Sequence, residues 1–180
     1  MATRRALLIA AASAAAGAAL AQAGAPDEVQ AELPGARLQG SGRMRHFGIL
    51  ICDARLWTRP GFDAPGFQRQ PLALELQYAR TLDGRRIAEK SLDEMRHVGD
   101  VPAARAAAWL AEMTAAFPDV AKGDRLTGVL RPRESVRFFF NGTLRREVAD
   151  VDFAERFFGI WLSPRTSAAS LRQDLIGEAR

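Results

Sequence analysis

Arg43 and Arg45 are the polar side chains best placed to hold a ligand. They lie two residues apart, at the start of a run that continues into the apolar residues Phe47, Ile49 and Ile51. In a strand without a bulge, side chains two apart point to one face, so both guanidiniums would stand at the mouth of an apolar face. They could then hold a carboxylate by bidentate hydrogen bonds. The alternative is that both arginines lie on a solvated strand end.

Other groups that could do chemistry lack a recognisable arrangement. The sequence has no Gly-x-Ser-x-Gly, no Gly-rich phosphate loop, no His-Glu-x-x-His and no paired cysteines with metal-ligand spacing. His46 and His97 are interpreted as surface or packing residues. Cys52 is the only cysteine and lies in an apolar run, which favours a buried, inert strand position. We therefore assign no catalytic residue, no metal ligand and no cofactor.

The first 23 residues have the composition of a signal peptide. Arg4 and Arg5 precede an apolar run over residues 6–20, which ends in the small-x-small patterns Ala19-Leu20-Ala21 and Ala21-Gln22-Ala23. This run is shorter than the roughly 20 residues that cross a bilayer. We therefore expect cleavage, a periplasmic location and no stable membrane span afterwards. Residues 3–8 also resemble a twin-arginine signal, so the export route stays open.

The charge balance gives no reason to expect a nucleic-acid partner. Lys and Arg number 25 against 21 Asp and Glu, and Arg4 and Arg5 account for half of that excess. Behind the signal, residues 24–34 contain Gly24, Pro26 and Pro34 and are expected to form a mobile leader. Residues 35–180 are expected to form one domain, long enough to bury a core without disulfides.

Alternating and helical periodicities predict an α+β domain. Phe138, Phe139 and Phe140 in succession put apolar side chains on both faces of a strand, which favours a layer or a ligand on each side of the sheet. Asn141-Gly142 predicts a hairpin turn, and Ser41-Gly42 is read as another. The expected strands are 36–40, 43–57, 72–78, 125–131, 135–141 and 143–148, and the expected helices are 84–99, 102–117, 152–163 and 167–177.

Several segments together resemble a known family. They are Leu38-Gln39-Gly40-Ser41-Gly42, Ile51-Cys52-Asp53-Ala54-Arg55-Leu56-Trp57, Ser91-Leu92-Asp93-Glu94-Met95-Arg96, Gly123-Asp124-Arg125-Leu126-Thr127-Gly128 and Phe157-Phe158-Gly159-Ile160-Trp161-Leu162-Ser163-Pro164. This pattern resembles the bacterial chalcone isomerase-like family. The resemblance implies an open-faced sandwich, in which helices are layered on one face of a large antiparallel sheet and the ligand lies between the layers.

The same resemblance suggests site residues. The family contains isomerases, in which an arginine polarises the substrate and a tyrosine assists through water, and fatty-acid-binding relatives in which arginine and tyrosine hold the acid group. On this placement Ile87 takes the tyrosine position and Glu94 the position of an asparagine. The chain's only tyrosine is Tyr78, and Arg37 lies near the expected arginine. The candidate ligand-binding residues are therefore Arg37, Arg43, Arg45, Tyr78, Ile87 and Glu94.

Three functions fit these observations. The first is a non-catalytic periplasmic binder of an apolar or amphipathic small molecule with an anionic or carbonyl head, such as a fatty acid. The second is an isomerase, an intramolecular lyase acting on a conjugated ketone, although isoleucine at position 87 cannot form the hydrogen bonds of a tyrosine. The third is an envelope protein that binds a partner and fills its cleft with its own side chains. The volume of the cleft separates the third function from the others.

Overall fold

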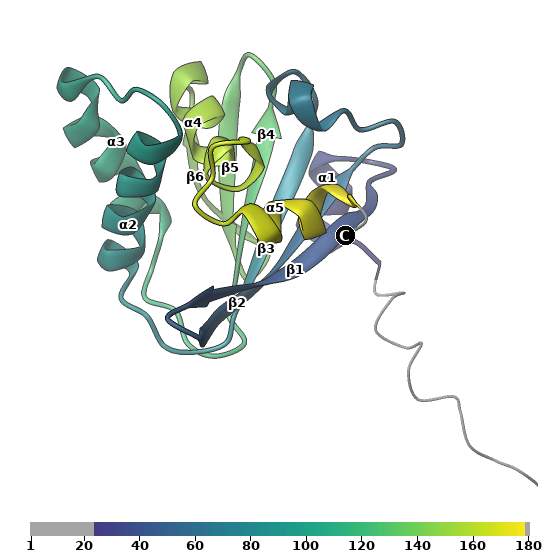
Figure 1. Cartoon of the computed structure of the whole chain (residues 1–180), viewed down its shortest axis with the longest axis horizontal. Coiled ribbons are helices and arrows are strands. Elements are labelled where there is room, and N and C mark those ends of the chain that lie inside the picture. Colours follow the sequence, from purple (N-terminus) through teal and green to yellow (C-terminus); the bar gives the residue numbers. More distant parts are fainter. Residues whose placement is uncertain (1–23, 179–180) are drawn as a thin grey trace, which may run out of the picture.

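Six strands in sequence order form one antiparallel sheet in the computed structural model, which describes residues 24–178 (Figure 1). The strands are β1 (Arg37–His46), β2 (Ile49–Thr58), β3 (Leu72–Tyr78), β4 (Arg125–Arg131), β5 (Ser135–Phe140) and β6 (Thr143–Val148). The helices are α1 (Asp27–Glu32), the 3-10 helix η1 (Ala64–Arg69), α2 (Gly84–Val98), α3 (Ala103–Ala116), α4 (Val151–Leu162) and α5 (Ala169–Ile176).

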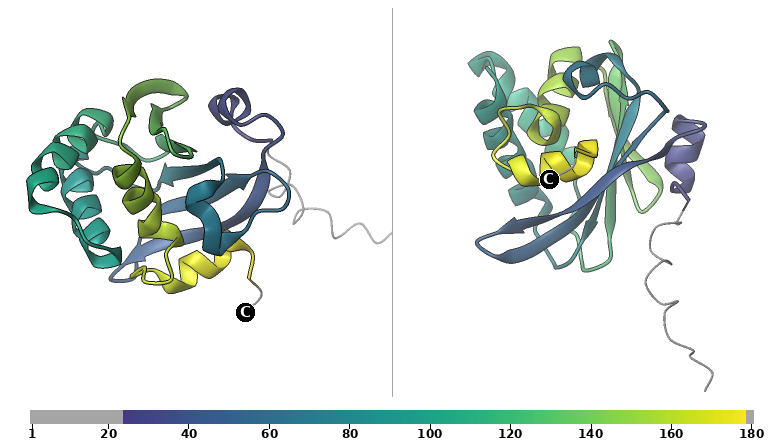
Figure 2. Two further views of the ribbon diagram at one scale, coloured as in Figure 1. Left: turned by 90° about the horizontal axis from the view of Figure 1, so that it is seen from above. Right: turned by 45° about the vertical axis from the view of Figure 1, so that its right-hand side comes forward.

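The helices form two unequal layers. Helices α2 to α5 lie on one face of the sheet and α1 lies on the other (Figure 2). Alternation along β3 explains how the sheet serves both layers, because Leu72 and Leu74 belong to the large core under α2 to α5, whereas Ala73 belongs to the small core under α1. The predicted α+β fold, a large antiparallel sheet with helices layered on one face, is confirmed.

Helix α4 contributes much of the large core. The carboxylate of Asp150 accepts a hydrogen bond from the backbone N–H of Phe153 at 3.0 Å and so caps the start of the helix. Phe153, Phe157 and Trp161, which follow one another at helical spacing, are all buried. The first two pack edge-to-face against Phe138 of β5, which ties the helix to this strand.

The first hairpin differs from its expected form. Its turn lies at Phe47-Gly48 and not at Ser41-Gly42, because β1 continues through Ser41, which pairs with Arg55 of β2. Glycine serves another purpose there. A Cβ atom at position 40 would lie 2.2 Å from the Asp174 carbonyl oxygen, so α5 packs directly on the backbone of β1. The glycines therefore mark a close approach of helix and strand. From composition alone, such a pair of glycines looks like a turn.

The segment expected to be a mobile leader folds instead onto the sheet. Within residues 24–34, α1 buries Val29 against Trp57 and Val129. The carboxylate of Glu28 accepts hydrogen bonds from the guanidinium of Arg125, the nearest at 2.9 Å. Apolar burial and this ion pair hold the helix, and neither is visible from the Gly and Pro content of the segment.

The structure does not test the prediction of a signal peptide. The proposed signal peptide, residues 1–23, does not belong to the described residues. Within residues 24–178, no helix has both the length and the apolar character needed to cross a bilayer.

Candidate ligand-binding cavity

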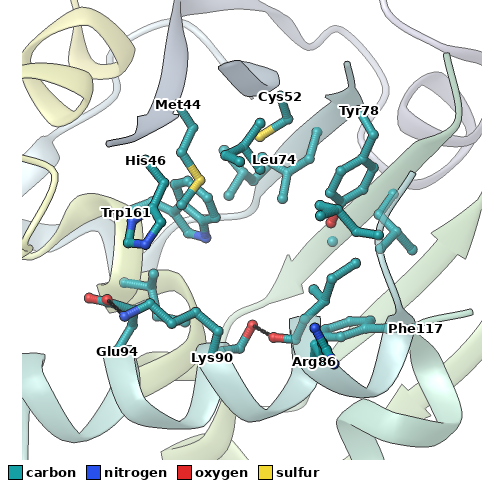
Figure 3. Close-up of a pocket in the computed structure, with 18 of the residues that line it drawn as sticks. Met44, His46, Cys52, Leu74, Tyr78, Arg86, Lys90, Glu94, Phe117 and Trp161 are labelled. Carbon is teal, nitrogen blue, oxygen red and sulfur yellow. Dashed lines mark hydrogen bonds and ion pairs between the residues drawn. The ribbon is translucent and has the colours of Figure 1, made fainter. Parts of the chain in front are cut away.

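An apolar cavity of about 370 Å³ lies between the sheet and the helical layer (Figure 3). Small-molecule sites in proteins usually have volumes of roughly 300–1,000 Å³, so this cavity has the size of a ligand site. Strands β1 to β5, helices α2 and α4, and the segment before α5 all contribute to its wall. Its large apolar side chains include Leu74, Leu76, Phe117, Phe138, Phe157 and Trp161.

The periodicities of β3 and α4 place these groups. Leu74, Leu76 and Tyr78 are spaced by two along β3 and therefore point to the same face of the sheet. On α4, Phe157 and Trp161 are separated by one helical turn and face the sheet from the other side. The cavity is thus a gap in the main core, bounded by residues that would otherwise pack against each other.

Three of the predicted site residues come together in the cavity wall. Tyr78 lies on β3, whereas Ile87 and Glu94 lie two turns apart on the same side of α2. Ile87 takes the position that the family resemblance gives to a tyrosine. Its aliphatic side chain lies at the edge of the cavity and can form no hydrogen bond.

The three predicted arginines do not line the cavity. A bulge between Met44 and Arg45 and the turn at Phe47 shape the hairpin so that Met44 and His46 face the cavity, while Arg43 and Arg45 do not. Arg43 Nε lies 3.4 Å from a carboxylate oxygen of Asp53 and its side chain is 68% exposed. Arg45 donates to the carbonyl oxygen of Gly48 at 3.0 Å.

Arg37 lies at the other end of the same strand. It pairs in register with Thr58 and is exposed. The expected pair of guanidiniums at the mouth of the apolar face is therefore absent from the described hairpin. The physical reason is the position of the turn. A turn at Ser41-Gly42 would put Phe47, Ile49 and Ile51 on one continuous strand with the arginines, whereas the chain turns at Phe47-Gly48.

The cations that do line the cavity are Arg86 and Lys90, one turn apart on α2 (Figure 3). Lys90 Nζ lies 2.8 Å from one carboxylate oxygen of Glu94, and the Ser167 hydroxyl donates to the other oxygen at 2.7 Å. The guanidinium of Arg86 makes no hydrogen bond or ion pair with any residue that the structure describes. Sequence reasoning missed Arg86, although its spacing from Lys90 and Glu94 places all three on one helix face.

Comparison with known proteins identifies the fold family. The family model described as chalcone isomerase-like matches residues 19–177. The chain belongs to the chalcone isomerase-like family. An uncharacterized protein of Haemophilus influenzae is 30% identical over 115 residues, which cover 62% of this chain and 54% of that protein, so the chain matches about half of its length.

A solved structure shares the chalcone isomerase-like fold. It is the crystal structure of an Arabidopsis thaliana fatty-acid binding protein, with a TM-score of 0.63 and 11% sequence identity. The superposition covers 79% of this chain and 87% of the plant protein. At this level of identity the similarity concerns the arrangement of the sheet and helices.

Ionisation of the polar groups in this chalcone isomerase-like cavity follows from burial and pairing. Burial, with a smaller contribution from the charge of Asp53, raises the pKa of the Cys52 thiol to about 12. Burial also raises the pKa of the Tyr78 phenol, and Cys52 adds to this effect. Near neutral pH both groups therefore keep their protons, so neither a thiolate nucleophile nor a phenolate base lines the wall.

Glu94 behaves in the opposite way. Its partial burial acts to raise the pKa, but hydrogen bonds from Lys90 and Ser167, together with the positive charges of Lys90 and His97, hold the pKa below its usual value. Glu94 is therefore a charged, paired group that neutralises Lys90, whereas the guanidinium of Arg86 has no partner within residues 24–178.

One buried donor of the cavity wall is unsatisfied. The indole Nε1 of Trp161 has no hydrogen-bond partner among the described residues, and the residue is only 7% exposed. An unpaired buried N–H group costs about 1–3 kcal/mol. Because Trp161 lines the cavity beside Met44 and His46 (Figure 3), an oxygen atom of a ligand could satisfy it.

Proposed function

We propose that the protein binds an apolar ligand with an anionic head, a molecule like a fatty acid, and catalyses no reaction on it. The observation that carries this proposal is the apolar cavity of about 370 Å³, with the guanidinium of Arg86 at its edge and no partner for that group in the described part of the chain. Membership of the chalcone isomerase-like family and the name of the plant structure with the same fold, a fatty-acid binding protein, support it.

The two ends of the ligand have different environments. The tail packs on Leu74, Phe138 and Phe157, where transfer of apolar surface from water is favourable. The carboxylate lies near Arg86, whose planar guanidinium offers two parallel N–H donors to a carboxylate. Lys90 already has Glu94 as its partner, so its contribution to binding is smaller.

The alternatives are less well supported by the same cavity. An intramolecular lyase would use a hydrogen-bonding side chain at the position of Ile87, and an isoleucine offers none. A partner-binding protein with a filled cleft would leave no volume between sheet and helices, whereas this cleft is open.

We also propose that the protein acts in the periplasm after removal of residues 1–23. The basic start, the apolar run and the small-x-small endings support this location. N-terminal sequencing of the periplasmic fraction should find a chain that begins near Gln22 or Gly24. An intact Met1 or Ala2 terminus in the membrane pellet would contradict the proposal.

A titration with cis-parinaric acid, a naturally fluorescent fatty acid, tests the binding function. The wild type should bind the acid more tightly than the corresponding alcohol, because only the acid pairs with Arg86. Arg86→Gln should weaken acid binding by roughly fivefold or more, equivalent to about 1 kcal/mol, and should leave alcohol binding nearly unchanged.

The matched control is Arg85→Gln. Arg85 carries the same charge one residue earlier on α2, but it pairs with Glu89 at 3.0 Å and does not line the cavity. This control should bind the acid like the wild type. Equal affinity of the wild type for acid and alcohol, or equal losses in both variants, would contradict an anionic head at Arg86.

A further inference from the structure

The outer end of the β1–β2 hairpin extends beyond the rest of the sheet (Figure 2). Pairing of β2 with β3 ends at Cys52 and Tyr78, and only one backbone bond follows it, from the Ala79 N–H to the Ile51 carbonyl oxygen at 2.9 Å. Strand β1 is the first strand of the sheet, so residues 45–50 pair only with each other. The hairpin therefore ends in a two-stranded projection.

The end of this projection is apolar and exposed. Phe47 is 91% exposed and Ile49 is 52% exposed, and we call these two residues the hairpin tip. Isolated apolar residues on a surface are common. Here, however, the most exposed large apolar side chain among the described residues stands at the end of a projection.

The backbone shows that Phe47 is an unfavourable choice for the turn. Phe47 and Gly48 have φ angles of 47° and 77°, and the β5–β6 hairpin reaches nearly the same angles, 48° and 85°, with Asn141 and Gly142. Asn-Gly is the favoured sequence for such turns, whereas a bulky residue at positive φ is strained. The same chain thus holds a phenylalanine where an asparagine would fit the backbone better.

Two arginines of β1 lie next to the tip. Arg45 belongs to the projection, and Arg43 lies two residues before it on β1, where it pairs with Asp53, the only acidic residue of β2. Exposed apolar side chains next to arginines are suited to the surface of an anionic bilayer, where the rings enter the interface and the cations meet lipid phosphates.

The hairpin also borders the cavity. Met44, His46 and Ile51 of the two strands line it, and the His46 ring contacts the Phe47 ring with centroids 4.4 Å apart. A membrane that receives the tip would therefore lie close to residues of the cavity wall. A ligand in the cavity would then be close to the bilayer surface.

We propose that the hairpin tip inserts into the surface of an anionic membrane, so that the protein exchanges its apolar ligand with the bilayer. The exchange rests on the ligand binding proposed above, whereas the membrane contact does not. Arg43 and Arg45, which do not line the cavity, act in this proposal on lipid headgroups.

Co-sedimentation with ligand-free vesicles tests the membrane contact. The chain from Gly24 onward should bind vesicles of equimolar phosphatidylcholine and phosphatidylglycerol more tightly than vesicles of phosphatidylcholine alone, and added salt should weaken this binding. Phe47→Asn should reduce the partition coefficient by roughly tenfold, since it removes the most exposed apolar ring. Arg45→Gln should reduce it by roughly fivefold on the anionic vesicles only.

Phe47→Asn is a variant that keeps the fold, because it creates the Asn-Gly sequence that the other hairpin uses. Its thermal midpoint should equal or exceed that of the wild type. The matched control is Leu144→Thr, which removes an apolar side chain of β6 that is 41% exposed and far along the sheet from the tip. This control should bind vesicles like the wild type.

Several outcomes would overturn the membrane contact. They are a wild type that does not sediment with either vesicle, a Phe47→Asn variant that binds like the wild type, or a preference for neutral vesicles. A dimer that dissociates on Phe47→Asn, without vesicle binding, would assign the tip to a second copy of this chain.

A titration without vesicles separates this proposal from the proposed function. Phe47→Asn should bind cis-parinaric acid in solution with wild-type affinity, since Phe47 does not line the cavity. If the acid binds but vesicles do not, only the membrane contact is wrong. If vesicles bind but the acid does not, the ligand-binding function is wrong and the membrane contact stands.

Discussion

Cys52 and Tyr78 pair in register across β2 and β3, and both side chains reach the cavity. Because burial keeps both groups protonated, they act there as neutral groups beside the apolar wall. The rim has the opposite character, with charged Glu94, Lys90 and Arg86 on α2. Polarity therefore increases from the wall to the rim, which is the gradient that an amphipathic ligand requires.

Cys52 should be unreactive in the native protein. Raising the thiol pKa from 9.0 to about 12 lowers the thiolate fraction near pH 8 by about a thousandfold, and the thiolate is the form that reacts. Alkylation by iodoacetamide, followed by mass spectrometry, should be at least about a hundredfold slower in native protein than in protein unfolded by urea. Rapid labelling of the native protein would show that Cys52 is more exposed and more acidic than the structure indicates.

Helix α2 positions the charged rim, and its link to the segment before α5 depends on pH. The pKa of Glu94 is lowered on folding, so the stabilisation from its charge is present above the unfolded pKa of about 4.5 and is lost as pH falls through the lower folded value. Glu94→Gln should therefore lower the thermal midpoint near pH 7, and the decrease should become smaller as pH falls from 7 toward 3. An equal decrease at both pH values would mean that the charge of Glu94 contributes nothing.

Two alanine substitutions in helix α4 should lower the free energy of unfolding by different amounts. Phe158 is fully buried and does not line the cavity, so Phe158→Ala should lower the free energy of unfolding by about 3–5 kcal/mol. Trp161 borders empty volume and carries an unsatisfied N–H, so Trp161→Ala should cost less. Urea unfolding of both variants measures the two values. A larger loss for Trp161→Ala would contradict a cavity at that side chain.

Sequence periodicity predicted most of these elements, and its failures have local causes. Alternation in β3 and the helical stripe of α4 reflect burial by many neighbours, so the pattern is strong. The glycines of β1 had a second explanation, close packing under α5, that a single sequence does not distinguish from a turn. Helix α1 is six residues long and is held by Arg125 and by the far face of the sheet, which are distant in sequence.

The site could be predicted only in part for the same reason. Ile87, Glu94 and Tyr78 all followed from the family resemblance, Tyr78 because it is the only tyrosine of the chain, and all three line the cavity. Arg86 was not among the predicted residues, and the predicted Arg43 and Arg45 lie outside the cavity, because the first hairpin turns at Phe47-Gly48. The expected turn at Ser41-Gly42 thus put the charge of β1 at the mouth of the apolar face, whereas the cations that line the cavity lie on α2.

At the scale of the whole molecule, the two faces of the sheet have different roles. One face carries the cavity and its helical cover, whereas α1 and a charged network cover the other. In that network, buried Glu75 accepts hydrogen bonds from Arg55 at 2.7 Å and from the Trp57 indole at 2.8 Å. This charged network and α1 thus cover the face opposite the cavity.

Purified protein should not cyclise chalcones above the background rate. The reason is chemical, since Ile87 and Glu94 stand where the family resemblance places an assisting tyrosine and asparagine, and Ile87 cannot form a hydrogen bond. An absorbance assay with a chalcone substrate measures the rate. Turnover that disappears on Arg86→Gln would favour the isomerase instead of the binding protein.

Native mass spectrometry with palmitate tests the central claim most directly, because the claim is that the cavity holds an apolar acid. The wild-type chain from Gly24 onward should retain one palmitate per chain. Leu76→Trp should abolish this adduct, since the larger ring occupies the cavity from β3, and circular dichroism should show that the fold is kept. No adduct on the wild type, or an adduct that persists on a folded Leu76→Trp variant, would contradict a ligand between the sheet and the helices.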